Sequence, residues 1–353
     1  MDEAPESILL WHQGALGDLL LAGPALQALR RRFPRARLLA VGHPERWRLL
    51  APTLGLGAVW DGGEALWSPL YAEDGALPPE LGRRLAGVEL AVVFRPRPPD
   101  TLARRLRQAG IPRVVWLPST PGATREPLSA LQLRHLAPVG VTESPSPVRL
   151  SLEEAAPWPE ELPSAVEFLA VAPGSGNPAK NWPLEFYYEA ARALSWELPC
   201  PLVWLAGPAE AAWRPYLEGL ARAQGHYLLF GRPLAQVARV LAHTRLYLGN
   251  DSGLSHLAAA AGARQVLVLF GPTDPVVWAP VGPGVTVLTA PEGDLRRLSV
   301  KRVLTVAREL VRGGQKIFPP GRREGIFEPG GEAEPVRHPG AGTGRREEGG
   351  KNY

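Results

Sequence analysis

The stretch Gly249-Asn-Asp-Ser-Gly-Leu-Ser-His-Leu-Ala-Ala-Ala-Ala-Gly262 decides how the rest of the chain is interpreted. It follows a β-like run at residues 245–248 and precedes a second one at residues 265–270. The polar turn opens into an alanine-rich segment of helical character that Gly262 can end. A strand, a polar turn and a helix N-terminus together present free backbone N–H groups and a positive dipole end. This pattern predicts a site for a phosphate or diphosphate, with His256 at its mouth.

Short apolar runs recur elsewhere, separated by helix-like segments, and the pattern restarts near residue 168. Continuous apolar strands between helices are typical of parallel sheets that are covered on both faces. We therefore predict an α/β protein with two Rossmann-like domains, whose parallel sheets face a central cleft. The strands are expected at residues 8–11, 38–41, 90–94, 113–117, 168–171, 202–205, 227–230, 246–248 and 266–270.

Helices are expected at residues 19–33, 183–194 and 295–311, with Pro24 either kinking the first or opening its second segment. A proline-rich segment at residues 145–163 separates the halves, and residues 148–151 could form a strand within it. The expected division of the chain is a first domain, a linker, a second domain, a terminal helix and a tail of disordered composition, at residues 1–150, 151–165, 166–290, 291–314 and 315–353.

Composition restricts the class of protein. The chain has 353 residues, of which 45% are hydrophobic and 21% charged, as in a soluble globular protein. Cys200 is the single cysteine, so no internal disulfide can form and a reducing compartment fits. The first residues are acidic, which argues against a secretion signal, and no apolar run approaches the length of about 20 residues that a membrane span needs. We therefore expect a cytoplasmic monomer.

Charge and motif content limit the kinds of molecule that the protein is expected to bind. The formal net charge is +4, and arginines cluster at residues 30–37 and 95–113. These clusters either are solvated surface or attract an anionic partner such as an acidic lipid surface. The sequence lacks zinc-ligand spacing, an Asp-x-Asp pair and a nucleic-acid signature, so neither a metal nor a nucleic acid is expected. Only four of the 39 basic residues are lysines, which makes Lys180 in a polar loop notable.

Three segments in order resemble glycosyltransferase family 9, the bacterial heptosyltransferases. The first contains Leu16-Gly-Asp18 and Pro24-Ala-Leu26 after a short strand; the second runs from Pro173-Gly to Lys180 and Trp182-Pro183. The third is Asn250-Asp-Ser-Gly with His256-Leu-Ala-Ala, followed by Phe270-Gly-Pro-Thr273. The resemblance implies a GT-B fold, in which the first domain binds the acceptor and the second binds a nucleotide sugar.

The resemblance also implies the reaction. It is an inverting, metal-independent transfer of a sugar from a nucleotide-diphosphate donor, with ADP-heptose expected, to a cell-envelope glycolipid. No cofactor is implied, and peripheral association with the inner face of the cell membrane would suit such an acceptor. Two other functions stay open on the sequence alone: a nucleotide-sugar 2-epimerase and a non-catalytic nucleotide-sugar-binding protein.

Asp18 is the catalytic candidate. From its position at the start of a helix, it could be an N-terminal cap or a carboxylate that complements the helix dipole. The resemblance implies that it is the general base, and the two roles are compatible. We expect the helix dipole to depress the pKa of this carboxyl.

The other candidate residues bind substrates. The resemblance implies that Lys180 neutralises the leaving diphosphate, although a loop lysine is more often solvated. The helix-mouth residues could simply cap the helix, and Glu210 could simply begin one. Arg95 and Arg97 follow a strand and are acceptor candidates for an anionic group, or surface charge. The full set of donor candidates is Lys180, Ser175, Gly176, Glu210, Asp251, Ser252, Gly253, His256 and Thr273.

Overall fold

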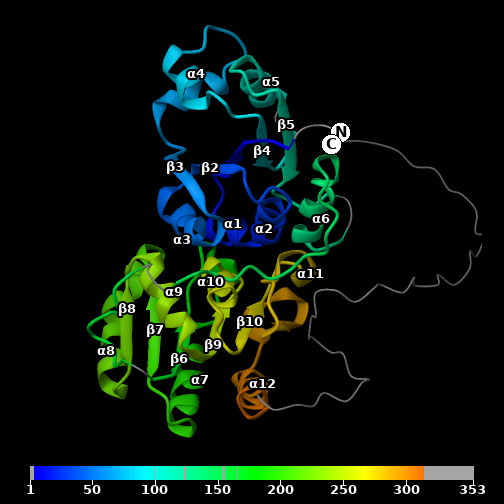
Figure 1. The fold of residues 1–353 in the computed structure, drawn as a ribbon. Coiled ribbons are helices and arrows are strands. Elements are labelled where there is room, and N and C mark those ends of the chain that lie inside the picture. Colours follow the sequence, from blue (N-terminus) through cyan, green and yellow to red (C-terminus); the bar gives the residue numbers. More distant parts are fainter. Residues whose placement is uncertain (1–3, 99, 123–124, 153–155, 165, 314–353) are drawn as a thin grey trace, which may run out of the picture.

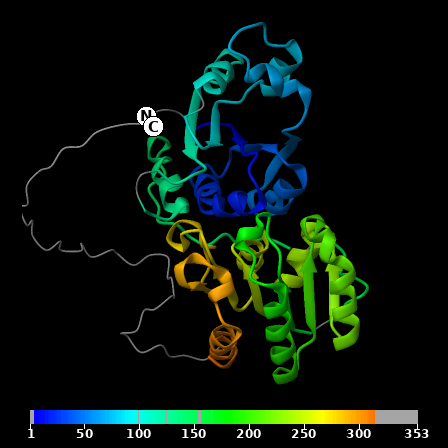
Figure 2. The same ribbon diagram turned by 180° about the vertical axis from the view of Figure 1, so that it is seen from behind.

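The computed structural model describes residues 4–313 apart from residues 99, 123–124, 153–155 and 165. Two α/β units, each built on one sheet, stack on each other along the long axis of the molecule (Figure 1). The view from behind shows the same two units meeting along one side of each (Figure 2). The expected tail at residues 315–353 lies outside the described residues.

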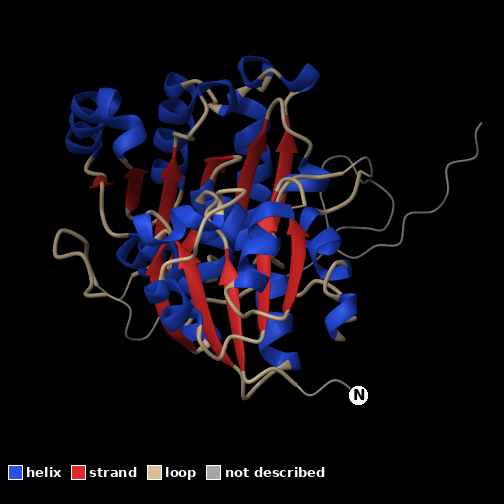
Figure 3. Cartoon of the chain, turned by 90° about the horizontal axis from the view of Figure 1, so that it is seen from above, coloured by secondary structure: helices blue, strands red, loops and turns tan. Residues whose placement is uncertain are grey.

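The first sheet has the order β3-β2-β1-β4-β5, and every neighbouring pair is parallel. The central strands are buried because their side chains are apolar on both faces, and helices lie on both sides of the strands (Figure 3). Its strands are β1 Ser7–Trp11, β2 Arg37–Gly42, β3 Leu56–Asp61, β4 Leu90–Arg95 and β5 Arg113–Pro118.

The helices of the first unit follow its strands. Pro24 opens a second helix rather than kinking a single one, because a proline ring fits the first helical turn. The segment expected as one helix at residues 19–33 is therefore two helices, and the first begins earlier, at Leu16. The elements are α1 Leu16–Leu21, α2 Gly23–Arg32, α3 Pro44–Leu54, η1 Ala65–Leu70, α4 Pro79–Leu85, α5 Asp100–Gln108, α6 Leu128–Arg134 and η2 Ala137–Val139.

The second sheet has the order β11-β10-β9-β6-β7-β8 and is also parallel throughout. Its strands are β6 Phe168–Ala172, β7 Leu202–Ala206, β8 Tyr227–Phe230, β9 Thr244–Asn250, β10 Val266–Phe270 and β11 Val285–Thr289. Its helices are η3 Pro178–Lys180, α7 Leu184–Glu197, η4 Pro208–Trp213, α8 Arg214–Gln224, α9 Leu234–Ala242, α10 Gly253–Ala261, α11 Pro275–Trp278, η5 Pro291–Gly293, η6 Leu295–Arg297 and α12 Val300–Arg312.

Several sequence expectations need correction. The helix expected at residues 295–311 is broken, because Ser299 caps a new helix with its side chain accepting from the Arg302 N–H. Residues 148–151 form no strand. The Leu150 N–H instead donates to Ala260 O, near the end of α10, at 2.9 Å. Strands β3 and β11 were not expected. Both lie at the edge of their sheet, and the side chains of β3 are half-buried or exposed.

The two units meet through helix N-termini at the carboxyl edges of the sheets. Helices α1–α3 of the first unit face α9–α11 of the second (Figure 1). A Cβ added at Gly253 would lie 3.1 Å from Leu16 Cβ and 3.3 Å from Gly17 N, so the absence of a side chain allows this close approach. Beside it, Glu45 Oε1 accepts a hydrogen bond of 2.9 Å from the Leu234 N–H. Within the described residues, no helix is both long and apolar enough to cross a membrane.

Candidate functional site

The strand, polar turn and helix start expected around residues 245–262 are present. Gly262, at φ 92°, ends the helix in the left-handed conformation that favours glycine. Ser252 is the N-cap residue, but its hydroxyl caps nothing and is buried without a hydrogen-bond partner. The alternative role considered for Ser252, capping the helix through its side chain, is therefore wrong. The first N–H groups of α10 remain free to bind an anion.

A cavity of about 600 Å³ lies beside this helix, between the two units. Five of the donor candidates line it: Ser175, Gly176, Glu210, Ser252 and Gly253. The first unit contributes residues that sequence reasoning did not select, because nothing local marks them as facing another domain. These residues are Leu16, His43, Glu45 and Arg46. The cavity is therefore formed by both halves of the chain.

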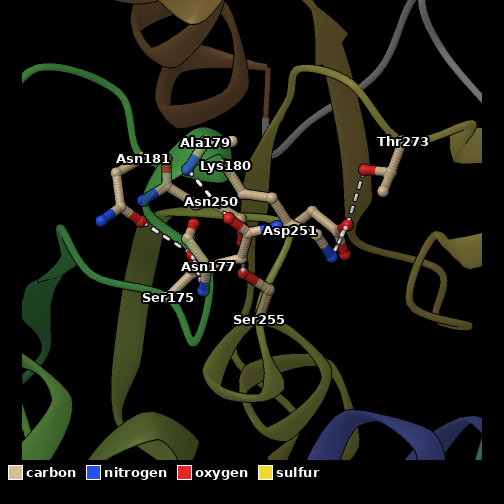
Figure 4. A network of polar contacts seen from close by, with 9 residues as sticks. All are labelled: Ser175, Asn177, Ala179, Lys180, Asn181, Asn250, Asp251, Ser255 and Thr273. Atoms are coloured by element: carbon tan, nitrogen blue, oxygen red, sulfur yellow. Dashed lines mark hydrogen bonds and ion pairs between the residues drawn. The ribbon is translucent and has the colours of Figure 1, made fainter.

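Lys180, Asp251 and Thr273 form one polar network (Figure 4). Lys180 Nζ lies 2.7 Å from Asp251 Oδ2, and Thr273 Oγ1 donates to the same oxygen at 2.7 Å. The Asp251 side chain is only 6% exposed, so this carboxylate depends on its partners for solvation. Asp251 is thus held by an ion pair rather than acting as a helix cap, and three of the sequence-predicted donor residues meet here.

Asn250 fixes the loop that carries Lys180, a role that sequence reasoning missed. Its side chain is fully buried and makes three hydrogen bonds. Oδ1 accepts from the Trp182 N–H at 3.0 Å and from Tyr187 Oη at 2.8 Å, while Nδ2 donates to Pro173 O at 2.8 Å. These bonds tie both ends of the loop to the end of β9, directly before Asp251. Asn250 stands inside the quoted motif, but its partners are remote in sequence.

Glu210 lies in the first turn of η4 and accepts a hydrogen bond of 2.8 Å from the Gly207 N–H. Burial raises the pKa of this carboxyl, and the hydrogen bond opposes the rise. A Cβ at Gly174 would lie 1.9 Å from Glu210 Oε1, so the carboxylate occupies the space that glycine leaves. Ser175 Oγ lies 2.7 Å from Asn181 Oδ1, and this bond holds the neighbouring loop (Figure 4).

Asp18 lies half-buried in the first turn of α1, where Oδ2 accepts a hydrogen bond of 3.1 Å from the Ala15 N–H. The expectation of a depressed pKa is wrong. Burial raises the pKa of this carboxyl; the Ala15 N–H, Lys180 and Arg46 oppose the rise, and Asp251 adds to it. Desolvation therefore outweighs the hydrogen bond from Ala15 and the two nearby cations. The influence of Lys180 also shows that the two units bring these side chains near each other.

His256 is buried in the first turn of α10. Burial lowers its pKa to about 4, so the ring is neutral at pH 7. A Cβ at Gly17 would lie 3.2 Å from His256 Cδ2, which places the ring against the turn that carries Asp18. A neutral imidazole in this place can donate or accept a hydrogen bond but does not contribute a positive charge.

The two acceptor candidates lie apart from the cavity. Arg95 is the last residue of β4, and its guanidinium lies 5.4 Å from the centre of the Tyr71 ring. Tyr71, which is 40% exposed, donates from Oη to Gln13 Oε1 at 3.1 Å. Arg97 is exposed in the turn that follows. Neither arginine lines the 600 Å³ cavity. In the part of the chain that the structure describes, no group of three or more His, Cys, Asp or Glu side chains could hold a metal ion.

A family model for glycosyltransferase family 9 (heptosyltransferase) matches residues 129–305, about half of the chain. The chain belongs to glycosyltransferase family 9. Lipopolysaccharide heptosyltransferase 1 of Escherichia coli O18:K1:H7 (strain RS218 / NMEC) is 34% identical over 125 residues, which are 35% of this chain and 37% of that relative. The match thus spans little more than a third of the curated relative.

Solved structures resemble the fold over most of the chain. The glycosyl transferase family 9 structure from Veillonella parvula DSM 2008 has a TM-score of 0.70 at 18% identity, covering 88% of this chain and 99% of that one. The E. coli ADP-heptose lps heptosyltransferase II has a TM-score of 0.68 at 20% identity, covering 88% and 100%. The prediction of a GT-B fold with two parallel-sheet domains is confirmed.

Proposed function

We propose that this family 9 member is an inverting, metal-independent glycosyltransferase. It moves a sugar from a nucleotide-diphosphate donor to an anionic glycolipid acceptor of the cell envelope. Heptose, supplied as ADP-heptose, is the expected donor sugar, and no cofactor is required. Family membership supports glycosyl transfer, and the similarity to heptosyltransferases supports heptose.

One observation carries the proposal: the first unit presents a carboxylate where the second presents an anion site. Asp18 lies in the turn against which His256 packs, and the charge of Lys180 acts on its carboxyl. A base and a leaving-group site that lie near each other where the two units meet are what a displacement at a sugar carbon needs.

The reaction follows from this arrangement. The Asp18 carboxylate takes the proton of the acceptor hydroxyl, and the hydroxyl oxygen forms a bond to the anomeric carbon. The bond from that carbon to the diphosphate oxygen breaks, and its electron pair leaves with the nucleoside diphosphate. Because the oxygen attacks the face opposite the leaving group, the configuration inverts.

The leaving diphosphate gains negative charge as the bond breaks. The free amides of Ser252 and Gly253 at the positive end of α10, together with Lys180, stabilise that charge. The neutral His256 ring adds a hydrogen bond. Asp251, which holds Lys180 and Thr273, takes sugar hydroxyls with its other oxygen, and Ser175, Gly176 and Glu210 bind the nucleoside side of the donor.

The acceptor binds the first unit through Arg95 and Arg97, whose guanidinium groups suit phosphate or carboxylate. An acceptor with a lipid anchor would bring the enzyme to the inner face of the cell membrane as a peripheral, monomeric protein of the cytoplasm. Nucleic acid is not among the proposed partners.

The experiment that tests the proposal is the Asp18→Asn variant. Turnover with a nucleotide-sugar donor and envelope glycolipid should fall about 100-fold or more, the scale of general base catalysis, while donor affinity stays nearly intact. Asp100→Asn is the matched control, because Asp100 is also an acid in the first turn of a helix of the same unit but is exposed. Wild-type turnover in Asp18→Asn would sink the assignment of the base.

A further inference from the structure

A single peptide unit connects two charged side chains at the candidate base. The amide between Gly14 and Ala15 has its carbonyl oxygen 2.8 Å from Arg46 Nη1, which donates to it. The N–H of the same amide donates to Asp18 Oδ2 at 3.1 Å. A guanidinium and a carboxylate are thus joined through one amide plane, although Arg46 and Asp18 come from different helices, α3 and α1.

This arrangement has a defined electronic effect. A positive donor at the carbonyl oxygen draws electron density from the amide and makes its N–H a stronger donor. Hydrogen bonds that follow one another in this way strengthen each other by roughly 10–30% per bond. The Asp18 carboxylate receives that strengthened N–H, so the arrangement favours its ionised form.

Arg46 is available for this role because its charge is not neutralised by a nearby carboxylate. Among the residues that the structure describes, Arg46 takes part in no ion pair, whereas Lys180 is paired with Asp251 at 2.7 Å. The start of α3 is also firmly held: Trp47 Nε1 donates to His12 O at 3.2 Å, and Glu45 accepts from the Leu234 N–H. The backbone that carries Arg46 is therefore held in place beside the turn at residues 14–18.

We propose that Arg46 is a positioning residue for Asp18: through the Gly14–Ala15 amide it orients the turn and keeps the carboxylate ionised, ready to take the acceptor's proton. The inference rests on the proposed role of Asp18 as base. It adds a residue from the start of α3 to the catalytic arrangement, which no motif of the sequence contains.

The groups that face Asp18 define the expected pH dependence. Burial raises the pKa of the carboxyl; Lys180 from η3 and Arg46 from α3 lower it, and Asp251 after β9 raises it. The His12 and His256 rings near the turn have pKa values lowered to about 4 and stay neutral near pH 7. Removing the Arg46 charge should therefore raise the pKa of Asp18 further, and the acidic limb of the kcat profile should move to higher pH.

Two measurements on Arg46→Gln test the proposal. The acidic limb of kcat against pH, at saturating donor, should move up by about one pH unit, in line with the loss of one nearby charge. The ¹³C carboxyl titration of Asp18, assigned by comparison with Asp18→Asn, should show a pKa shift of the same sign without any substrate. Arg48→Gln is the matched control, since Arg48 is exposed on the same helix and does not line the cavity.

The outcomes separate this inference from the proposed function. An unshifted Asp18 titration in Arg46→Gln overturns the role of Arg46, whatever the activity. If Asp18→Asn keeps wild-type turnover, the base assignment fails and the role of Arg46 fails with it. If Arg46→Gln does not fold, Arg46→Lys replaces it: the retained charge should keep the acidic limb and the Asp18 titration close to those of the wild type. A shift of about one pH unit in Arg46→Lys overturns the proposal.

Discussion

Replacing Asn250 by alanine should damage the site through the loop that carries Lys180. The change leaves three buried groups without partners: the Trp182 N–H, the Tyr187 hydroxyl and the Pro173 carbonyl (Figure 4 shows Asn250 beside the loop). Each unsatisfied buried group costs about 1–3 kcal/mol. Because three neighbouring losses are not additive and the loop can relax, we expect the second unit to lose about 3–5 kcal/mol of unfolding free energy.

The assay is urea unfolding followed by circular dichroism, combined with hydrogen–deuterium exchange of the peptides that cover residues 173–187. A chain with two units need not unfold in one step, so the exchange data assign the loss to the loop. Exchange should rise in this segment and stay unchanged in β1–β5. Affinity for a nucleoside diphosphate should fall as well, because Lys180 is no longer held beside Asp251.

Asn181→Ala supplies the control. Asn181 is only half-buried, and its Oδ1 accepts one hydrogen bond of 2.7 Å from Ser175 Oγ. Its removal should cost about 1 kcal/mol, the usual net worth of one hydrogen bond. A loss below about 1 kcal/mol for Asn250→Ala, or an equal loss for both variants, would refute the reasoning.

Two further predictions concern the contact between the units and the buried histidines. Glu45→Ala removes the acceptor of the Leu234 N–H at the start of α9. Calorimetry should show that the free energy of unfolding falls by about 1 kcal/mol or less and that nucleoside diphosphate binding weakens. Glu45→Gln should restore both. Burial lowers the pKa of His12 and His256 from 6.5 to about 4, so the unfolded chain binds more protons between these values. Stability should therefore fall as pH drops from 6.5 towards 4. At pH 4.5, His12→Leu should be spared roughly 2 kcal/mol of the fall in unfolding free energy that the wild type shows. The same dependence of melting temperature on pH in wild type and variant would count against this prediction.

The parallel-sheet architecture was predictable because it depends on local patterns. Apolar runs such as residues 168–171 are buried on both faces and need no partner to be recognised as strands. Strand β3 was missed because its side chains are half-buried and its sequence lacks a continuous apolar run. The break before α12 was missed although its signal is local, since Ser299 accepts from the N–H of Arg302, three residues further on.

The candidate site was predictable where the residues of a motif lie in one short segment. The start of α10 forms as expected, since a polar turn followed by a helix is determined within about ten residues. Helix α1 begins at Leu16, three residues before the expected helix. The sign of the Asp18 pKa shift was not predictable, because desolvation comes from atoms of both units rather than from the helix itself. The role of Arg46 was not predictable either, because Gly14, whose carbonyl oxygen accepts its hydrogen bond, lies 32 residues away in the sequence.

The sequence by itself determined two parallel sheets, a helix start at Gly253 after a polar turn, and a carboxylate in the first turn of another helix. Only the tertiary structure decided what these elements do together. It brought Gly17 against His256, placed Lys180 within reach of Asp251, and joined Arg46 to Asp18 through one amide. The reason is physical: backbone patterns follow from neighbouring residues, whereas desolvation and charge–charge interactions depend on distances in space, which the packing of two units sets.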